Sequence, residues 1–307
     1  MRFGPGSIFR AADGRLRAIW RAVLYVLLCG VLTLAAQLAL DLVLAQGDSQ
    51  RNAPVAAGGP LLPEQGIPLY ALMIVAALTA AWWMLNVFDQ RSFRTLGLSF
   101  EPSWWRQLLL GVAVGATLIV AVVGAGAVSG AVRWRLAPER FGFAEFFALG
   151  AMLLLAAAWE EIIFRGYLFQ RLVESLGALW AVALLAALFG AAHIPNPAAT
   201  PLSTANTALA GILLAVAYLK TRALWLPIGI HFAWNWVMGP VLGFPVSGIR
   251  IPTRLLAAEV SGPLWLSGGD YGPEGSVVLT AAAVAVTVWL ARTRAICPST
   301  DRQNVLQ

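Results

Sequence analysis

The polar residues best suited to chemistry lie in three places within or beside apolar stretches of the chain. These places are Glu160-Glu161-x-x-x-Arg165, His193 after an uncharged apolar run, and His231-x-x-x-Asn235. The chain has only two histidines, and both occur here. Ionisable groups inside a membrane span cost several kcal/mol and usually mark function. The coincidence of these groups therefore favours one functional site over three unrelated features.

Each place also has an ordinary structural interpretation. The two glutamates are compatible with a helix end at the membrane interface, where charge costs little, and Arg165 lies one turn after Glu161. His193 is compatible with a cap at a helix C-terminus. His231 and Asn235 share a helical face, where they are compatible with a hydrogen-bonding pair that joins two helices. Taken together, the three places favour chemistry over these separate explanations.

The chemistry that these residues suit is hydrolysis by activated water. A buried glutamate such as Glu160 takes a proton from water, and a nearby His193 orients that water. His231 and Asn235 have the donors to stabilise the oxyanion formed at a peptide carbonyl. These motifs contain no serine or cysteine that could act as a nucleophile. Zinc is an alternative, because Glu160, His193 and His231 are a possible ligand set, but the HExxH spacing is absent.

The spacing also predicts how the three places meet. If 143–175 and 178–194 form one helical hairpin turning near Gly177, Glu160 and His193 both lie about 24 Å along the helices from the turn. The two side chains are then expected at one height. Counting from the charged stretch 220–222 brings His231 and Asn235 to a similar depth. We therefore expect one cavity shared by all four residues.

The amino-acid composition indicates the environment in which these residues lie. Of 307 residues, 59% are hydrophobic and 12% are charged, about half the charged fraction of a soluble domain. Several apolar runs reach about 18 residues, enough to cross about 30 Å of hydrocarbon. The net charge of +6 comes mostly from arginines in loops and at segment ends, without a basic helix that carries interleaved aromatics. This pattern indicates membrane topology and excludes a nucleic-acid partner.

The predicted fold class is an all-α, polytopic transmembrane helical bundle of about eight spans. The apolar segments are 18–44, 68–88, 105–130, 143–175, 178–194, 204–219, 223–240 and 276–292. The basic N-terminus predicts that both termini are cytosolic. Loops 89–104 and 220–222 and the turn near 176 then lie on the cytosolic side, and 46–67, 131–142, 195–203 and 241–275 lie opposite. Residues 1–307 are expected to form a single integral membrane domain.

The ordered motifs Glu160-Glu161-x-x-x-Arg165, Phe189-x-x-x-His193 and His231-x-x-x-Asn235 resemble those of the CPBP family. That family comprises type II CAAX prenyl endopeptidases, bacteriocin-processing enzymes and Abi-type proteins. The resemblance covers residues 159–235, within a catalytic core expected at 143–240. It implies a cavity open to the cytosol, Glu160 activating water with help from His193, and His231 and Asn235 stabilising the oxyanion. Glu161 and Arg165 are implied to be auxiliary.

The resemblance implies an intramembrane endopeptidase that acts on a peptide or membrane-protein substrate in contact with membrane lipid. It leaves open whether a divalent metal such as zinc assists, because the family has been described in both ways. The Ala-, Leu- and Arg-rich composition predicts a bacterial inner-membrane protein. The alternatives are a non-catalytic membrane scaffold or immunity protein with the same fold, and a transporter with a Glu160–His193 proton relay. The nearly uniformly apolar outer halves of the spans disfavour the transporter.

Overall fold

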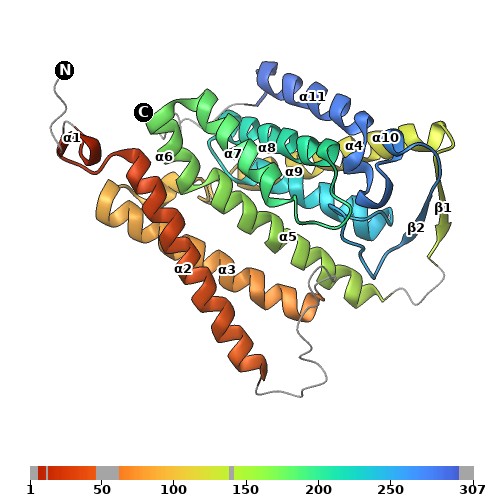
Figure 1. Cartoon of the computed structure of the whole chain (residues 1–307), viewed down its shortest axis with the longest axis horizontal. Helices are drawn as coiled ribbons and strands as arrows, with labels where there is room; N and C mark the ends of the chain where they lie inside the picture. Colours follow the sequence, from red (N-terminus) through yellow and green to blue (C-terminus); the bar gives the residue numbers. More distant parts are fainter. Residues whose placement is uncertain (1–5, 12, 46–61, 138–141, 297–307) are drawn as a thin grey trace.

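The computed structural model describes residues 6–11, 13–45, 62–137 and 142–296 (Figure 1). The α-helices are α1 (Gly6–Phe9), α2 (Ala18–Ala45), α3 (Pro63–Met84), α4 (Trp104–Val128), α5 (Phe143–Arg165), α6 (Tyr167–Leu176), α7 (Ala178–Ala192), α8 (Pro201–Thr221), α9 (Trp225–Trp236), α10 (Leu264–Ser267) and α11 (Val277–Arg292). Short π-turns, η1 (Leu85–Asp89) and η3 (Val237–Val241), extend α3 and α9. A 3₁₀ turn, η5 (Pro273–Gly275), precedes α11.

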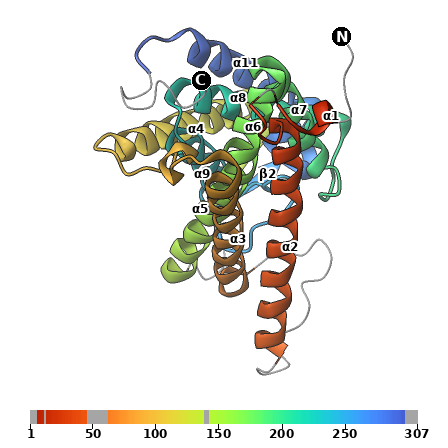
Figure 2. The same cartoon turned by 90° about the vertical axis from the view of Figure 1, so that its left-hand side faces the viewer.

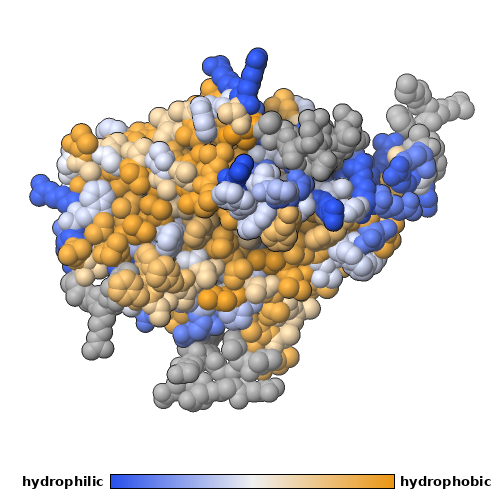
Figure 3. All heavy atoms as spheres, turned by 180° about the vertical axis from the view of Figure 1, so that it is seen from behind, coloured by the Kyte–Doolittle hydropathy of each residue, from blue (hydrophilic) through white to orange (hydrophobic). Residues whose placement is uncertain are grey.

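Each of the eight apolar segments expected from the sequence contains a helix. Among the described residues, five helical stretches are long and apolar enough to cross a membrane, and α7 and α11 are shorter apolar helices. Many leucines and valines of α2 stay exposed, including Leu27, Val31 and Leu42. The face seen in Figure 3 is mostly hydrophobic, with hydrophilic residues at its edges and in a patch on the right-hand half of the view. Such a surface suits lipid rather than water.

The helices pack in two groups that meet at α5. Helix α2 lies along α3, and α3 packs against α5 (Figures 1 and 2). On the other side, α4 packs against α9, α7 against α8, and α11 against α8. The bundle has two buried apolar clusters. One lies around Tyr25, Met84 and Phe169 and also takes in residues of α7, α8 and α9, and the other lies around Ile119, Leu213 and Ile230. Helix α5 joins the two groups and therefore has a central place in the molecule.

The expected continuous helix over 143–175 is wrong, because the backbone breaks at Gly166. This residue has φ −79° and ψ −127°, which no helix adopts, and it separates α5 from α6. A Cβ on Gly166 would lie 2.2 Å from the Ile162 carbonyl oxygen, so only glycine fits the corner. Consequently α7 packs against α6 and α8 instead of running antiparallel along α5.

Beside the expected helical bundle, the structure contains one small sheet among its described residues. Strands β1 (Val132–Leu136) and β2 (Leu256–Val260) pair antiparallel, with Trp134 opposite Ala258. In β1, Val132, Trp134 and Leu136 alternate with Arg133 and Arg135. This period of two is the signature of a strand. The segment is too short to change the helical character of the bundle.

Segments expected on the same side of the membrane lie together in the structure. At one end the contacts are Arg21 with Asp89 and Glu174, Gln170 with Thr95, Leu224 with Gly97, and Lys220 with Thr293. At the other end they are Ala131 with Ser261, Asn196 with Ser247, and Gly248 with Tyr271. Residues 46–61 of the remaining outer segment lie outside the described residues. The alternation of segments between two ends therefore agrees with the arrangement of the helices.

Helices α4 and α9 approach each other through glycines. Gly111 and Gly115 face the backbone of α9, and Gly229 faces that of α4. An added Cβ would lie 2.3 Å from a carbonyl oxygen at all three positions, on Leu226, Ile230 and Leu108 respectively. Small residues spaced by four permit such close helix packing in membranes. The contact sets the position of α9, which carries His231 and Asn235.

The α4–α9 contact gives a first prediction. Gly115→Ala is expected to lower the free energy of unfolding by about 1–3 kcal/mol, because the methyl group meets backbone that cannot yield. Gly124→Ala in the same helix meets nothing within 4 Å and is the matched control. It is expected to be neutral or to stabilise by up to about 1 kcal/mol. Thermal unfolding of both variants in detergent measures the difference, and equal stabilities would contradict the close contact.

Candidate active site

The four residues expected to share a site line one cavity of about 350 Å³. Glu160 comes from α5, His193 follows the last residue of α7, and His231 and Asn235 come from α9. Apolar walls are added by α5 and α8, including Leu153 and Leu214. The structure thus brings the four residues together, although the continuous hairpin from which we inferred their meeting does not exist.

The adjacent glutamates of α5 lie in different surroundings. The Glu160 side chain is 22% exposed and lines the cavity, with its Oε2 3.7 Å from His231 Nε2. The Glu161 side chain is completely buried, and its Oε1 lies 2.8 Å from His231 Nδ1. This difference follows from the helix, because adjacent residues point about 100° apart. Only Glu160 is placed to meet a molecule in the cavity.

Arg165 holds Glu161 in place from one turn further along α5. Its Nη1 donates to Glu161 Oε1 at 3.0 Å, and its Nη2 donates to the Gly211 carbonyl on α8 at 3.0 Å. The guanidinium carbon lies 4.7 Å from the centre of the Phe189 ring on α7. Arg165 is therefore a buried connection between α5, α7 and α8 and does not line the cavity.

His231 lies between the two carboxylates. Its Nδ1 faces Glu161, and its Nε2 faces Glu160 and the cavity. Because Glu161 can only accept a hydrogen bond when ionised, Nδ1 carries a proton and the ring orientation is fixed. Asn235 follows one turn later on the same face and has no hydrogen-bond partner among the described residues. Both side chains are therefore positioned to offer groups to a cavity ligand.

His193 caps α7 as its sequence position suggests, and it also reaches the cavity. Its Nδ1 lies 2.8 Å from the Phe189 carbonyl oxygen, so this nitrogen donates. The ring packs 4.9 Å, centre to centre, from the Phe189 ring. In the neutral tautomer that results, Nε2 is an acceptor. Capping and chemistry are thus compatible roles for the same histidine.

Sequence reasoning missed one buried acid of the cavity, Glu274 in η5. Its Oε1 accepts from Trp234 Nε1 at 3.0 Å, and its Oε2 accepts from the Ser247 backbone at 2.5 Å and hydroxyl at 3.0 Å. Asn196, three residues after His193, donates to the Ser247 carbonyl at 3.1 Å. Glu274 therefore links α9 to the loops around His193. Its sequence neighbourhood of Gly and Pro suggested only an outer loop.

The burial of Glu274 gives a pH prediction. Burial raises the pKa of Glu274, which lies outside the spanning helices, despite its hydrogen bonds to Ser247 and Trp234. Between the unfolded pKa of about 4.3 and the raised folded pKa, the native state holds the extra proton. Stability from this group is therefore complete below pH about 4.3 and falls as pH rises, by at most about 1.4 kcal/mol per pH unit.

Thermal unfolding in detergent across this pH range measures the effect. Glu274→Gln is expected to flatten the fall in stability with rising pH, because the amide does not titrate. Glu259→Gln is the matched control, since Glu259 is an exposed acid of β2. An unchanged pH profile in Glu274→Gln, with a changed profile in the control, would assign the titration to another group.

The side chains do not form an evident metal site. Among the described residues, no three His, Cys, Asp or Glu side chains lie close enough together to hold a metal ion. Glu160, His193 and His231, the ligand set of the zinc alternative, thus share a cavity without forming such a group.

Comparison with known proteins points to one family. A family model described as type II CAAX prenyl endopeptidase Rce1-like matches residues 142–237. Neither a curated protein nor a solved structure matches the chain. The matched region begins at the start of α5 and ends just after α9, and it contains Glu160, His193, His231 and Asn235. Glu274 lies outside it.

Proposed function

We propose that this multi-pass membrane protein, whose residues 142–237 form an Rce1-like domain of the type II CAAX prenyl endopeptidase family, hydrolyses peptide bonds with water activated by Glu160. One observation carries the proposal. Of the two adjacent glutamates, Glu160 alone reaches the cavity, where it shares the space with His193, His231 and Asn235. Glu161 is completely buried behind them, where its Oε1 contacts Arg165 and His231.

The reaction begins with water between Glu160 and His193. Glu160 takes one proton from water, and His193 Nε2 accepts a hydrogen bond from the other O–H. The remaining hydroxide oxygen attacks the substrate carbonyl carbon, and the carbonyl π electrons move to its oxygen. When the tetrahedral intermediate collapses, the C–N bond breaks and Glu160 passes its proton to the leaving amine. The base is thereby restored without a covalent enzyme intermediate.

His231 and Asn235 stabilise the negative oxygen of that intermediate. The Asn235 amide has N–H groups without a partner among the described residues. His231 lies 2.8 Å from Glu161 through Nδ1, and its imidazolium form donates from Nε2 as well. Donors fixed before the reaction stabilise developing charge strongly in a site with little water. Glu161 and Arg165 act indirectly, by holding His231 and α5.

The orientation follows from the arginine distribution. We place the end of the bundle formed by Arg21, Arg171 and Lys220 on the cytosolic side of a bacterial inner membrane, with both termini cytosolic. Residues 143–240 form the catalytic core of a single membrane domain. The substrate is a peptide or a membrane protein whose cleavable segment enters the cavity from the bilayer or the cytosol.

Metal removal separates this mechanism from zinc catalysis. Exhaustive dialysis of the purified protein against a chelator is expected to change cleavage by less than about twofold, because the proposed base is a carboxylate and the His/Asn pair supplies the oxyanion donors. Peptide cleavage before and after dialysis, with and without added zinc, measures this. Loss of cleavage that zinc restores would instead assign Glu160, His193 and His231 as metal ligands.

The function is tested by comparing peptide N-termini in membranes of cells that make the native protein or Glu160→Gln. The substitution keeps the side-chain size and removes the base. Termini found only with the native protein support proteolysis and identify the substrate. Identical termini, with both proteins folded and equally abundant, would favour a non-catalytic scaffold or immunity protein of the same fold.

A further inference from the structure

A second cavity, of about 530 Å³, opens at the cytosolic end of α2, away from the candidate active site. It is formed by the residues just before α2, the start of α2, the segment after η1, and the end of α6. Its charged lining residues are Asp13, Arg15, Arg17, Arg21, Arg91, Arg171 and Glu174. None of them takes part in the proposed hydrolysis.

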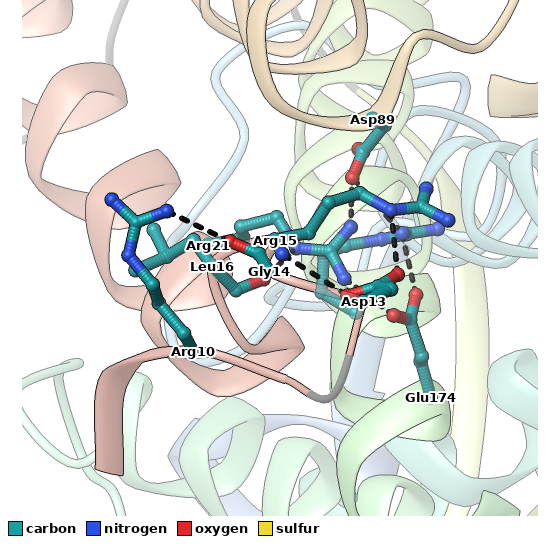
Figure 4. A network of polar contacts seen from close by, with 9 residues as sticks. Arg10, Asp13, Gly14, Arg15, Leu16, Arg21, Asp89 and Glu174 are labelled. Atoms are coloured by element: carbon teal, nitrogen blue, oxygen red, sulfur yellow. Dashed lines mark hydrogen bonds and ion pairs between the residues drawn. The ribbon is translucent and has the colours of Figure 1, made fainter. Parts of the chain in front are cut away.

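The floor of this cavity is a buried and fixed pair of arginines. Arg21 pairs with Asp89 and Glu174, and Figure 4 shows these three residues together. Arg171 Nη1 lies 3.2 Å from Asp89 and 2.6 Å from Glu174. Asp89 is completely buried beneath them. Two carboxylates thus fix two guanidinium groups at one place, and the four charges of this floor balance.

The rim adds arginines whose hydrogen-bonding capacity is unused. Arg17 donates through Nε to the Arg10 carbonyl at 3.2 Å, and Arg15 donates through Nε to Asp13 at 2.7 Å. The terminal nitrogens of Arg15 and Arg17, and the whole Arg91 guanidinium, have no hydrogen-bond or ion-pair partner among the described residues. Five arginines face three carboxylates when Asp89 is included, which leaves two excess positive charges.

The position of the cavity matches the headgroup layer of a membrane. It adjoins Ala18, where the spanning stretch Ala18–Leu42 begins. Nearby, Ile8 and Phe9 are 59% and 51% exposed, and the Phe9 ring lies 5.1 Å from the Trp20 ring. Exposed apolar and aromatic side chains beside arginines are typical of a segment that rests in the interface. A negatively charged group at this depth is available from lipid.

We propose that this cavity binds a phosphate oxyanion, supplied by the headgroup of an anionic phospholipid in the cytosolic leaflet. Guanidinium groups bind phosphate oxygens with two parallel N–H donors, and basic pockets among membrane helices bind anionic headgroups. Arg17 and Arg91 at the rim supply the free donors and part of the excess positive charge. The charge-balanced floor of Arg21, Arg171, Asp89 and Glu174 holds the base of the cavity in place. Because the site ties α2 to α6, an occupied site stabilises the whole bundle.

Thermal unfolding of the purified full chain in a nonionic detergent tests the proposal. The probes are dihexanoyl-phosphatidylglycerol, dihexanoyl-phosphatidylcholine and inorganic phosphate, each titrated at low and high salt. The test variant is Arg17→Gln/Arg91→Gln, which removes rim donors and leaves the buried pairs intact. The matched control is Arg106→Gln, an exposed arginine at the start of α4 outside the cavity.

Saturable stabilisation by phosphatidylglycerol at low salt, weaker with phosphatidylcholine, is expected for the native chain and Arg106→Gln. The half-saturating concentration is expected to rise about tenfold or more in the double variant. Equal saturation by inorganic phosphate at similar concentrations, lost in the double variant, supports the oxyanion site and overturns the lipid source. Stabilisation by none of the probes, or an unchanged response in the double variant, overturns the site itself.

Discussion

Glu160→Gln is expected to lower kcat/KM for peptide cleavage by about 10²- to 10⁴-fold, because an amide cannot take the proton from water. The loss should appear in kcat, since the substitution preserves the shape of the cavity. Stability should change little. Glu160 Oε2 accepts no hydrogen bond among the described residues, and His231 Nε2 lies 3.7 Å from it. Cleavage of a substrate found by N-terminal comparison measures the activity, and thermal unfolding measures the stability.

The matched control is Glu161→Gln, the same chemical change one residue away. Glu161 is completely buried and is the partner of both Arg165 and His231. This variant should lose stability, with a smaller loss of activity through a poorly held His231. The two variants thus distinguish the loss of the catalytic base, Glu160, from the loss of the residue that holds His231, Glu161. Full activity in Glu160→Gln with a 10²-fold loss in folded Glu161→Gln would transfer the role of base to Glu161.

The helical segments could be predicted because lipid makes apolar length a strong signal. All eight apolar segments contain helices, since backbone groups in hydrocarbon must be satisfied within the segment. The break at Gly166 was missed because apolar residues continue through Phe164 and Tyr167 on both sides of it. Its cause is tertiary, a corner where only glycine fits against the Ile162 carbonyl. The periodicity of the sequence does not reveal that contact.

For the candidate site too, some features could be predicted from the sequence and others depend on tertiary contacts. Glu160, His193, His231 and Asn235 were found because polar residues are rare in these spans, and they do share a cavity. Their meeting was inferred from a continuous hairpin that the structure contradicts, and it arises instead from the packing of α7 and α9 around α8. Glu274 was missed because the sequence alone does not show that an acid in a Gly- and Pro-rich loop is buried. Its burial becomes visible only when the loop is seen packed against Trp234 and Ser247. Buried loop acids are recognised through their partners.

Arg165→Met is expected to lower the free energy of unfolding by about 3–5 kcal/mol, because it leaves the Glu161 carboxylate buried without its cation. The change also removes the donor to the Gly211 carbonyl, which connects α5 to α8. Arg165→Lys keeps the charge but cannot reach both Glu161 and Gly211 in the same fork geometry, so an intermediate loss is expected. Equilibrium unfolding in mixed micelles measures these free energies.

Two comparisons distinguish lost pairing from lost packing. Arg135→Met breaks the exposed pair with Glu259, in which both side chains are more than half exposed, and should cost less than about 1 kcal/mol. In Glu161→Gln/Arg165→Met no buried charge is left unpaired, so the double variant should be more stable than the sum of the single losses implies, by about 1–3 kcal/mol. Strict additivity would mean that Arg165 stabilises mainly by filling space beside Phe189. A positive coupling would mean that Arg165 holds Glu161, and through it His231, at the wall of the cavity.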